Sequence, residues 1–273
     1  MKEGSHLIII GSMRSGTTSL YRHLSKHSKI CPSTKKEPEF FTKNQSHGAN
    51  VEKYEEIWDC EDSSQKYKME ASTGYTKYPI EKGVPERIKE YGIQPKFIYI
   101  VRNPIDRMIS QYNFMNISLG YNLDCFYEEE IVELSKYYKQ LNEFRKVFGE
   151  RSRYLIVDFE NLVENPKKVL KRCSEFIGIK YEWKFQSQKA SNKTPNRKLE
   201  LWISQLGAFK NILGRLLTEG QRIRLKRFLG WFTPRVDRRE MTPSERSEAH
   251  EMLWTDMKKF EKEFGFNVSK WGF

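Results

Sequence analysis

The residues of this chain with the clearest chemical potential lie near its beginning, in a loop bounded by Gly11 and Gly16. An apolar run at residues 7–10 precedes the loop, and a helix-like stretch begins at Thr17. The two glycines let the backbone turn tightly, so that successive N–H groups and the positive end of a helix dipole converge on one anionic group. The pattern therefore predicts an oxyanion cradle between a strand and a helix.

The glycine spacing of this loop matches that of a nucleotide-binding P-loop, but the cation is placed differently. Thr17 stands where such a loop carries the lysine that grips a phosphate, and the nearest cation is Arg14 inside the loop. We therefore interpret the bound anion as something other than the γ-phosphate of ATP.

A second cluster of chemically useful residues lies at positions 97–112, where Arg102 ends an apolar run. Ligands of open α/β sheets bind at the carboxyl ends of the strands, which is where Arg102 falls. Ser110 lies about two turns into the following helix, on a face that can look back toward the strand end. A guanidinium fork and a hydroxyl together suit a phosphate. Two anion sites without an obvious acidic Mg²⁺ ligand between them imply a ligand with phosphates at two separate ends.

The elements that must position these residues alternate between strand-like and helix-like segments. Strand-like apolar runs occupy residues 7–10, 96–101 and 154–157. Helix-like segments are expected at 17–26, 104–114, 166–177 and 243–264, with a long amphipathic helical region at 123–148. Apolar runs without strict alternation suit a parallel sheet that is covered on both faces. The sequence therefore predicts an α/β fold, a P-loop-like parallel β-sheet flanked by helices on both faces, as a single domain over residues 1–273.

The composition of the chain indicates the charge of its ligands, the state of its cysteines and its location. Lys and Arg outnumber Asp and Glu by 48 to 36, a net charge of +12, so the surface attracts anions. The cysteines are widely spaced, and we expect reduced thiols rather than a zinc site or a disulfide framework at Cys31, Cys60, Cys125 and Cys173. No apolar run approaches the roughly 18 residues that span a bilayer, and we expect a cytoplasmic protein.

Three ordered motifs resemble those of PAPS-dependent sulfotransferases, in particular the bacterial and heparan-sulfate-type branch; PAPS is 3′-phosphoadenosine 5′-phosphosulfate. The motifs are Arg14-Ser15-Gly16-Thr17-Thr18, Lys36-Glu37-Pro38-Glu39-Phe40-Phe41, and the pair Arg102 and Ser110 in the form R-x-P-x-x-R-x-x-S-x-Y. The resemblance covers most of the chain and is weakest over 199–240. It implies the sulfotransferase fold and metal-independent transfer of a sulfuryl group from PAPS to a hydroxyl, with an amine second, of a small molecule or glycan.

The resemblance also implies roles for the matching residues. The 3′-phosphate of PAPS would lie on Arg102 and Ser110, and Glu37 would be the general base that takes the acceptor's proton as sulfur is attacked in line. Arg14 and the helix dipole would stabilise charge on the leaving phosphate oxygen. The residues implied to hold the 5′-phosphosulfate, with their neighbour in the helix, are Arg14, Ser15, Gly16, Thr17, Thr18 and Ser19. A late basic loop that closes over the nucleotide would contribute Lys193 or Arg197.

Two departures from the family pattern affect the expected site. Arg14 stands where many relatives have Lys, which keeps the cationic stabilisation but weakens the case for proton donation to the leaving group. Residues 70–75 lack the Lys that heparan-type enzymes carry after Glu, which weakens the case for glycan-specific contacts. Glu70 itself either positions the acceptor or makes a structural pair, and His47 is an alternative base.

Two other functions stay open at this point. A P-loop kinase would bind ATP or GTP with Mg²⁺, which Thr17 in place of Lys disfavours. The second alternative is a noncatalytic module that binds polyanions or membranes. It is suggested by the net charge and by residues 207–239, where apolar residues interleave with Lys and Arg. We expect no nucleic-acid partner and no transmembrane segment, with peripheral membrane contact through 207–239 as an option. The acceptor's identity and the oligomeric state are not set by the sequence.

Overall fold

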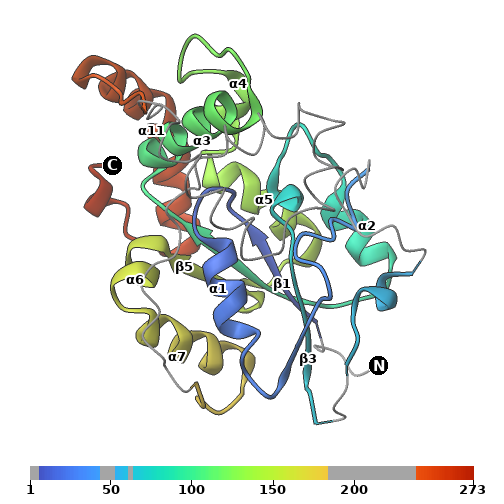
Figure 1. Cartoon of the computed structure of the whole chain (residues 1–273). Coiled ribbons are helices and arrows are strands. Elements are labelled where there is room, and N and C mark those ends of the chain that lie inside the picture. Colours follow the sequence, from blue (N-terminus) through green and yellow to red (C-terminus); the bar gives the residue numbers. More distant parts are fainter. Residues whose placement is uncertain (1–5, 44–52, 61–63, 184–237) are drawn as a thin grey trace, which may run out of the picture.

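The computed structural model describes residues 6–43, 53–60, 64–183 and 238–273 (Figure 1). At its centre is a five-stranded sheet in the order β2-β3-β1-β4-β5, in which all neighbouring strands are parallel. The strands are β1 (His6–Gly11), β2 (Ile30–Pro32), β3 (Tyr67–Ala71), β4 (Lys96–Val101) and β5 (Tyr154–Asp158). Because the strands are parallel, their carboxyl ends meet at one edge of the sheet.

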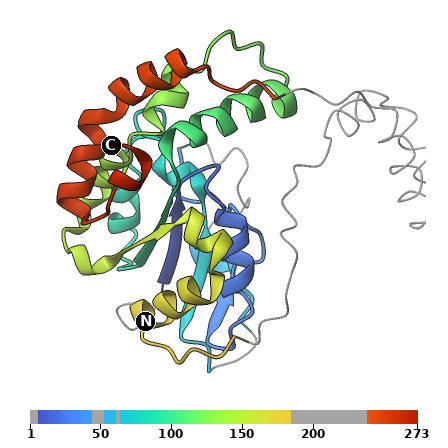
Figure 2. The same ribbon diagram turned by 90° about the vertical axis from the view of Figure 1, so that its left-hand side faces the viewer.

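Helices cover both faces of this sheet (Figures 1 and 2). On one face lie α1 (Thr17–Leu24), α6 (Phe159–Glu164) and α7 (Pro166–Ile177). On the other lie α2 (Val84–Glu90), α3 (Pro104–Phe114), α4 (Glu129–Glu133), α5 (Tyr137–Phe148) and α11 (Pro243–Phe264). Within the described ranges, no helix is both long enough and apolar enough to cross a membrane.

The central strand β1 shows why the sequence forms a doubly covered sheet. Leu7 and Ile9 enter the core shared with α1 and α7, whereas Ile8 and Ile10 enter the core shared with α5 and α11. Successive side chains of a strand point to opposite faces, so a strand with helices on both sides needs an unbroken apolar run. The predicted α/β architecture is confirmed.

Local signals in the sequence set the ends of the helices on either side of the site. Asn103 caps α3, its side chain accepting from the N–H of Ile105 at 3.0 Å, and Pro104 begins the helix. Thr242 and Glu245 form a capping box at the start of α11. The expectation of one long helical region at 123–148 is wrong, because the chain becomes helical only at α4 and breaks again before α5.

The prediction of reduced thiols is wrong for one pair of cysteines. Cys31 in β2 forms a disulfide with Cys60, with a Cα–Cα distance of 5.6 Å, while Cys125 and Cys173 are free. The segment before Cys60 returns to β2, since the N–H of Thr34 donates to the carbonyl of Ile57 at 2.8 Å. Sequence spacing cannot show such a return over 29 residues, so the pair was missed. The disulfide closes a ring of chain that includes the loop after β2.

Candidate active site

The carboxyl edge of the sheet brings together the loops that carry the candidate residues. The loop after β1 carries Arg14, the loop after β2 carries Glu37, and the turn after β4 begins with Arg102. Because β1, β2 and β4 belong to one parallel sheet, these three groups lie along the edge of the sheet at which α1 begins.

Two close contacts shape the loop between β1 and α1. A Cβ at Gly11 would lie 2.2 Å from Oγ1 of Thr76, and a Cβ at Gly16 would lie 2.9 Å from the ring of Phe159. Gly16 also has φ +84°, in the left-handed region that favours glycine. Both positions therefore require glycine, as the sequence pattern predicted.

The side chain of Ser15 supports this loop from the inside. Ser15 is fully buried, and its Oγ lies 2.7 Å from Oγ of Ser12, which donates to the carbonyl of Ile100 at 2.8 Å. Because the Ser12 hydroxyl has one hydrogen, already used, the Ser15 hydroxyl donates to it. Gly16 provides no side-chain cap, so the first N–H groups of α1, at Thr17 and Thr18, point out of the helix as an anion cradle requires.

Arg14 joins the two predicted anion sites. Its Nε donates to Oγ of Ser110 at 3.2 Å, although the two residues are 96 positions apart. Its guanidinium also lies over the ring of Phe114, 4.5 Å from the centroid, which fixes the plane of the group. Ser110 thus contacts the β1–α1 loop.

Three guanidinium groups, those of Arg14, Arg102 and Arg107, influence one another at this edge. Within the described part of the chain, none of the three forms an ion pair with a carboxylate. Burial and the positive charges of Arg102, Arg238 and Arg107 lower the pKa of Arg14 from 12.5 to about 10. A cluster of cations without acidic partners favours the binding of a multiply charged anion.

Arg107 is the most deeply placed of these cations. It is fully buried, and its Nη1 donates to Oγ of Ser135 at 2.7 Å and to the carbonyl of Ile131 at 3.3 Å. Its Nε and Nη2 have no hydrogen-bond partner among the described residues. Arg107 is the second arginine of the R-x-P-x-x-R-x-x-S-x-Y motif, but its burial was not evident from the sequence, because an arginine on a helix is ordinarily a surface residue.

The Arg102 turn is held from two sides. The hydroxyl of Tyr137 donates to the carbonyl of Arg102 at 2.7 Å, and the N–H of Asn103 donates to Glu160 at 3.3 Å. The guanidinium of Arg102 lies 5.0 Å from the ring centroid of Phe159. The guanidinium of Arg102 therefore lies beside the start of α6, at Phe159.

Glu37 lies on the other side of β1. Its N–H donates to the carbonyl of Ala71 at 2.9 Å, which continues the pairing of β2 with β3 beyond the strand. Its carboxylate forms an ion pair with Lys36, and the side chain is 38% exposed. A carboxylate open to solvent at this edge can meet an incoming acceptor.

The carboxylate of Glu70, unlike that of Glu37, is closed off from solvent. Glu70 is fully buried, and its carboxylate accepts hydrogen bonds from the hydroxyls of Tyr54, Ser72 and Tyr75 at 2.6, 2.5 and 2.9 Å. Burial raises the pKa of Glu70 from 4.5 to about 7. Of the two roles left open by the sequence, the structure supports pairing within the protein.

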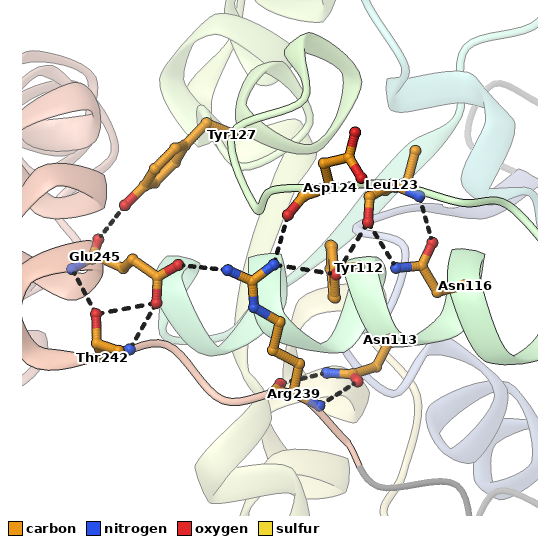
Figure 3. A network of polar contacts seen from close by, with 9 residues as sticks. All are labelled: Tyr112, Asn113, Asn116, Leu123, Asp124, Tyr127, Arg239, Thr242 and Glu245. Atoms are coloured by element: carbon orange, nitrogen blue, oxygen red, sulfur yellow. Dashed lines mark hydrogen bonds and ion pairs between the residues drawn. The ribbon is translucent and has the colours of Figure 1, made fainter.

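A network that the sequence did not suggest joins Tyr112 and Asn113 of α3 to Arg239 (Figure 3). Arg239 donates to the Tyr112 hydroxyl at 3.3 Å and to Glu245 at 2.8 Å. The side chain of Asn113 bonds both to the backbone N–H and to the carbonyl of Arg239. The contacts of Arg239 with Tyr112 and Asn113 join residues more than 120 positions apart, so no local pattern signals them. They fix the chain next to Arg238, whose charge reaches Arg14.

Some predicted residues cannot be placed. His47, Lys193, Arg197 and residues 207–237 lie outside the described residues. Within the ranges that are described, no three or more His, Cys, Asp or Glu side chains cluster in a way that could hold a metal ion.

A comparison with known protein families identifies the family to which this chain belongs. A family model described as "Sulfotransferase domain" matches residues 4–260. The chain belongs to the sulfotransferase family. The family assigned from the three motifs is thereby confirmed.

Individual relatives of this sulfotransferase are distant. The membrane-associated sulfotransferase kil1 of Dictyostelium discoideum is 32% identical over 111 residues, 40% of this chain and 22% of that protein. Human heparan sulfate glucosamine 3-O-sulfotransferase 5 is 26% identical over 188 residues, 63% of this chain and 53% of that protein. The chain thus spans about half, or less, of the length of these curated relatives.

Solved structures confirm the sulfotransferase fold. A sulfotransferase from Alicyclobacillus acidocaldarius superposes with a TM-score of 0.69 at 21% identity, covering 100% of both chains. A mouse sulfotransferase complexed with PAP, the desulfated form of PAPS, superposes with a TM-score of 0.50 at 16% identity, covering 94% of this chain and 86% of that chain.

Proposed function

We propose that this sulfotransferase moves the sulfuryl group of PAPS to a hydroxyl of a small molecule or glycan. The observation that carries the proposal is the contact of Arg14 with Ser110, which joins the cradle after β1 to the helix after β4. PAPS has a phosphosulfate at the 5′ end and a phosphate at the 3′ position of one ribose. It can therefore occupy both elements at once.

The residues present fit such a donor. The N–H groups of Gly16, Thr17 and Thr18 would hold the 5′-phosphosulfate at the start of α1. Arg102 and Ser110 would hold the 3′-phosphate. Within the described residues Arg14, Arg102 and Arg107 form no ion pair with a carboxylate, so an anion would supply the negative charge that balances them.

Glu37 would act as the general base on the acceptor. The acceptor oxygen forms a bond to sulfur, its proton passes to the Glu37 carboxylate, and the bond between sulfur and the 5′-phosphate oxygen breaks. The leaving oxygen gains negative charge, which Arg14 and the first N–H groups of α1 stabilise. The products are the sulfated acceptor and PAP.

Binding measurements separate this function from its rivals. Calorimetry with PAP, 5′-AMP and ATP, each with and without Mg²⁺, should show tight binding of PAP without Mg²⁺ and weaker binding of the other two. A transfer screen with radiolabelled PAPS over phenols, sugars and alkaloids should then reveal the acceptor class. Tight ATP binding that needs Mg²⁺ would point to a kinase instead. Salt-sensitive heparin binding without PAP binding or sulfuryl transfer would point to a noncatalytic polyanion module.

A further inference from the structure

The buried carboxylate of Glu70 lies beside the loop that carries Glu37. Two of the three hydroxyls that donate to Glu70 also hold the backbone of that loop. Oγ of Ser72 accepts the N–H of Glu39 at 3.0 Å, and the hydroxyl of Tyr75 accepts the N–H of Phe41 at 3.4 Å. With the bond from Glu37 to Ala71, three alternate N–H groups of the loop are fixed to residues 71–75.

The directions of these hydrogen bonds depend on the charge of Glu70. A hydroxyl has one hydrogen and donates once, whereas an ionised carboxylate only accepts. Ser72 and Tyr75 therefore direct their hydrogens at Glu70, which leaves their lone pairs for the N–H groups of the loop. A group at position 70 that itself donated a hydrogen would reverse at least one of the three hydroxyls, and a reversal at Ser72 or Tyr75 would disturb the bonds that hold the loop.

The loop has a backbone conformation that needs such support. Glu37 has φ +60° and Glu39 has φ +47°, both in the left-handed region. Residues with a side chain seldom adopt this region, and they stay in it only where the surroundings hold them. Glu39 also packs tightly, since a Cβ at Gly74 would lie 2.7 Å from its carboxylate.

We propose that Glu70 is a positioning residue, which acts through Ser72 and Tyr75 to fix the loop at residues 36–41 and with it the carboxylate of Glu37. This inference rests on the proposed function, in which Glu37 takes the acceptor's proton. A misplacement of about 1 Å in a reacting group lowers a rate by as much as about 100-fold, so a hydrogen-bond chain of this kind can control turnover.

The same arrangement gives turnover a pH dependence. Glu70 has a pKa raised to about 7 by burial, with the charge of Glu39 adding to the increase. The phenols of Tyr54 and Tyr75 also face it, and burial raises the pKa of each far above neutrality, while Tyr21 on α1 has a raised pKa as well. When Glu70 takes up a proton below pH 7, it becomes a donor. We therefore expect turnover to fall as pH drops through about 7.

The test compares Glu70→Gln, Ser72→Ala and Tyr75→Phe with two matched controls. Tyr91→Phe removes a nearby tyrosine hydroxyl that bonds to Tyr54 N–H and Glu55, and Ser174→Ala removes a buried serine hydroxyl on α7. We would measure hydrogen exchange of the 36–42 backbone, kcat for a hydroxyl acceptor from the transfer screen, and PAP affinity.

In Glu70→Gln, the amides at 37, 39 and 41 should exchange faster, and kcat should fall by about tenfold or more while PAP affinity stays unchanged. The fall in turnover that we expect for the wild type as pH drops through about 7 should be absent from this variant. Ser72→Ala and Tyr75→Phe should each show part of the effect and the controls none. These two variants remove one hydrogen bond to the loop each, and they carry the test if Glu70→Gln does not fold.

Three results would overturn the proposal. They are wild-type exchange in the loop of Glu70→Gln, wild-type turnover in that variant, and a loss of PAP affinity as large as the loss of kcat. A wild-type protein that neither binds PAP nor transfers sulfuryl would instead refute the proposed function. The exchange experiment would then still decide whether Glu70 fixes the loop.

Discussion

At the scale of single residues, the proposed mechanism separates the group that would take a proton from the groups that would hold the donor. Glu37 follows β2 and is tied to the end of β3, whereas Arg14 and Arg102 follow β1 and β4. Only the second set lies close to Ser110 and α3. Substitutions in the two sets should therefore change different measured quantities.

Replacing Glu37 by Gln removes the proton acceptor and keeps the shape of the side chain. We expect kcat to fall by about 100-fold or more, because a general base contributes 10² to 10⁴ in rate. PAP affinity should stay unchanged, since the Glu37 carboxylate pairs with Lys36 outside the cradle. Radiolabelled transfer and calorimetry measure the two quantities, with Glu56→Gln as an exposed control. Near-normal turnover would remove Glu37 from the mechanism.

Replacing Arg102 by Ala should weaken PAP binding far more than 5′-AMP binding, because only PAP carries a 3′-phosphate. A hydrogen bond to a charged group is worth about 1.5–3 kcal/mol, so the dissociation constant for PAP should rise by roughly 10- to 150-fold. Calorimetry gives both constants, and Arg22→Ala, exposed on α1, is the control. Equal losses for the two nucleotides would mean that Arg102 does not hold the 3′-phosphate.

The sequence could reveal residues that act through short motifs. Gly11, Gly16 and Arg14 lie within one strand–loop–helix unit, so their spacing predicts their geometry. It could not assign Glu70 a single role, because the hydroxyls of Tyr54 and Tyr75 reach it only in the folded chain. Charge and burial are set by tertiary neighbours, which local patterns do not contain.

At the scale of elements, helix ends were predictable and connections were not. Pro104, Pro166 and Pro243 each begin a helix at the expected residue, because proline suits the first helical turn. The short strand β2 and the disulfide beside it were missed. Three residues that include Pro32 carry too little periodicity to be recognised as a strand.

The Cys31–Cys60 disulfide should contribute to stability by restricting the unfolded chain. For a closed loop of 29 residues the entropic model gives about 3.5 kcal/mol. The Cys31→Ser, Cys60→Ser double variant should lose about that much free energy of unfolding in urea. Non-reducing peptide mapping should find these two cysteines joined, and Cys125→Ser is the control. Free thiols at Cys31 and Cys60 in the oxidised protein, in addition to those of Cys125 and Cys173, would contradict the structure.

The contact between α11 and α5 should make stability depend on pH. Asp256 accepts the backbone N–H groups of Tyr138 and Lys139 at 2.9 Å, and burial raises its pKa from 3.8 to about 6. The native state therefore binds more protons than the unfolded state between pH 4 and 6, so this group's contribution to stability falls as pH rises.

Asp256→Asn removes that titration. Since one pKa unit corresponds to about 1.4 kcal/mol, the stability of the wild type relative to the variant should decrease by about 2 kcal/mol from pH 4 to pH 7. Urea unfolding at several pH values gives the difference. A pH-independent difference between the two proteins would show that Asp256 titrates at an ordinary pKa.

At the scale of the whole molecule, positive charge is concentrated where an anion would bind. The chain carries a net charge of +12, and Arg14, Arg102 and Arg107 influence one another at one edge of the sheet. Mutual repulsion there lowers the stability of the protein without ligand, and an anionic ligand would relieve it.

PAP should therefore raise the melting temperature more than simple salt does. At 100 times the dissociation constant, binding adds about 2.7 kcal/mol, or roughly 5–10 °C for a chain of this size. Sodium chloride at equal ionic strength should give a smaller shift, because it only screens the charges. Thermal unfolding of the wild type and of Arg14→Ala measures the effect. Equal shifts with PAP and chloride would contradict a specific site.

The order of the strands has a consequence for how such an enzyme changes its substrate. In the proposed mechanism the loops that would hold the nucleotide follow β1 and β4, while the loop of the base and its supporting residues follow β2 and β3. Substitutions around the base could thus change the reaction with the acceptor while the loops that would recognise the donor stay the same. Proteins with this fold could then differ in the acceptor that they sulfate while they use the same sulfate donor.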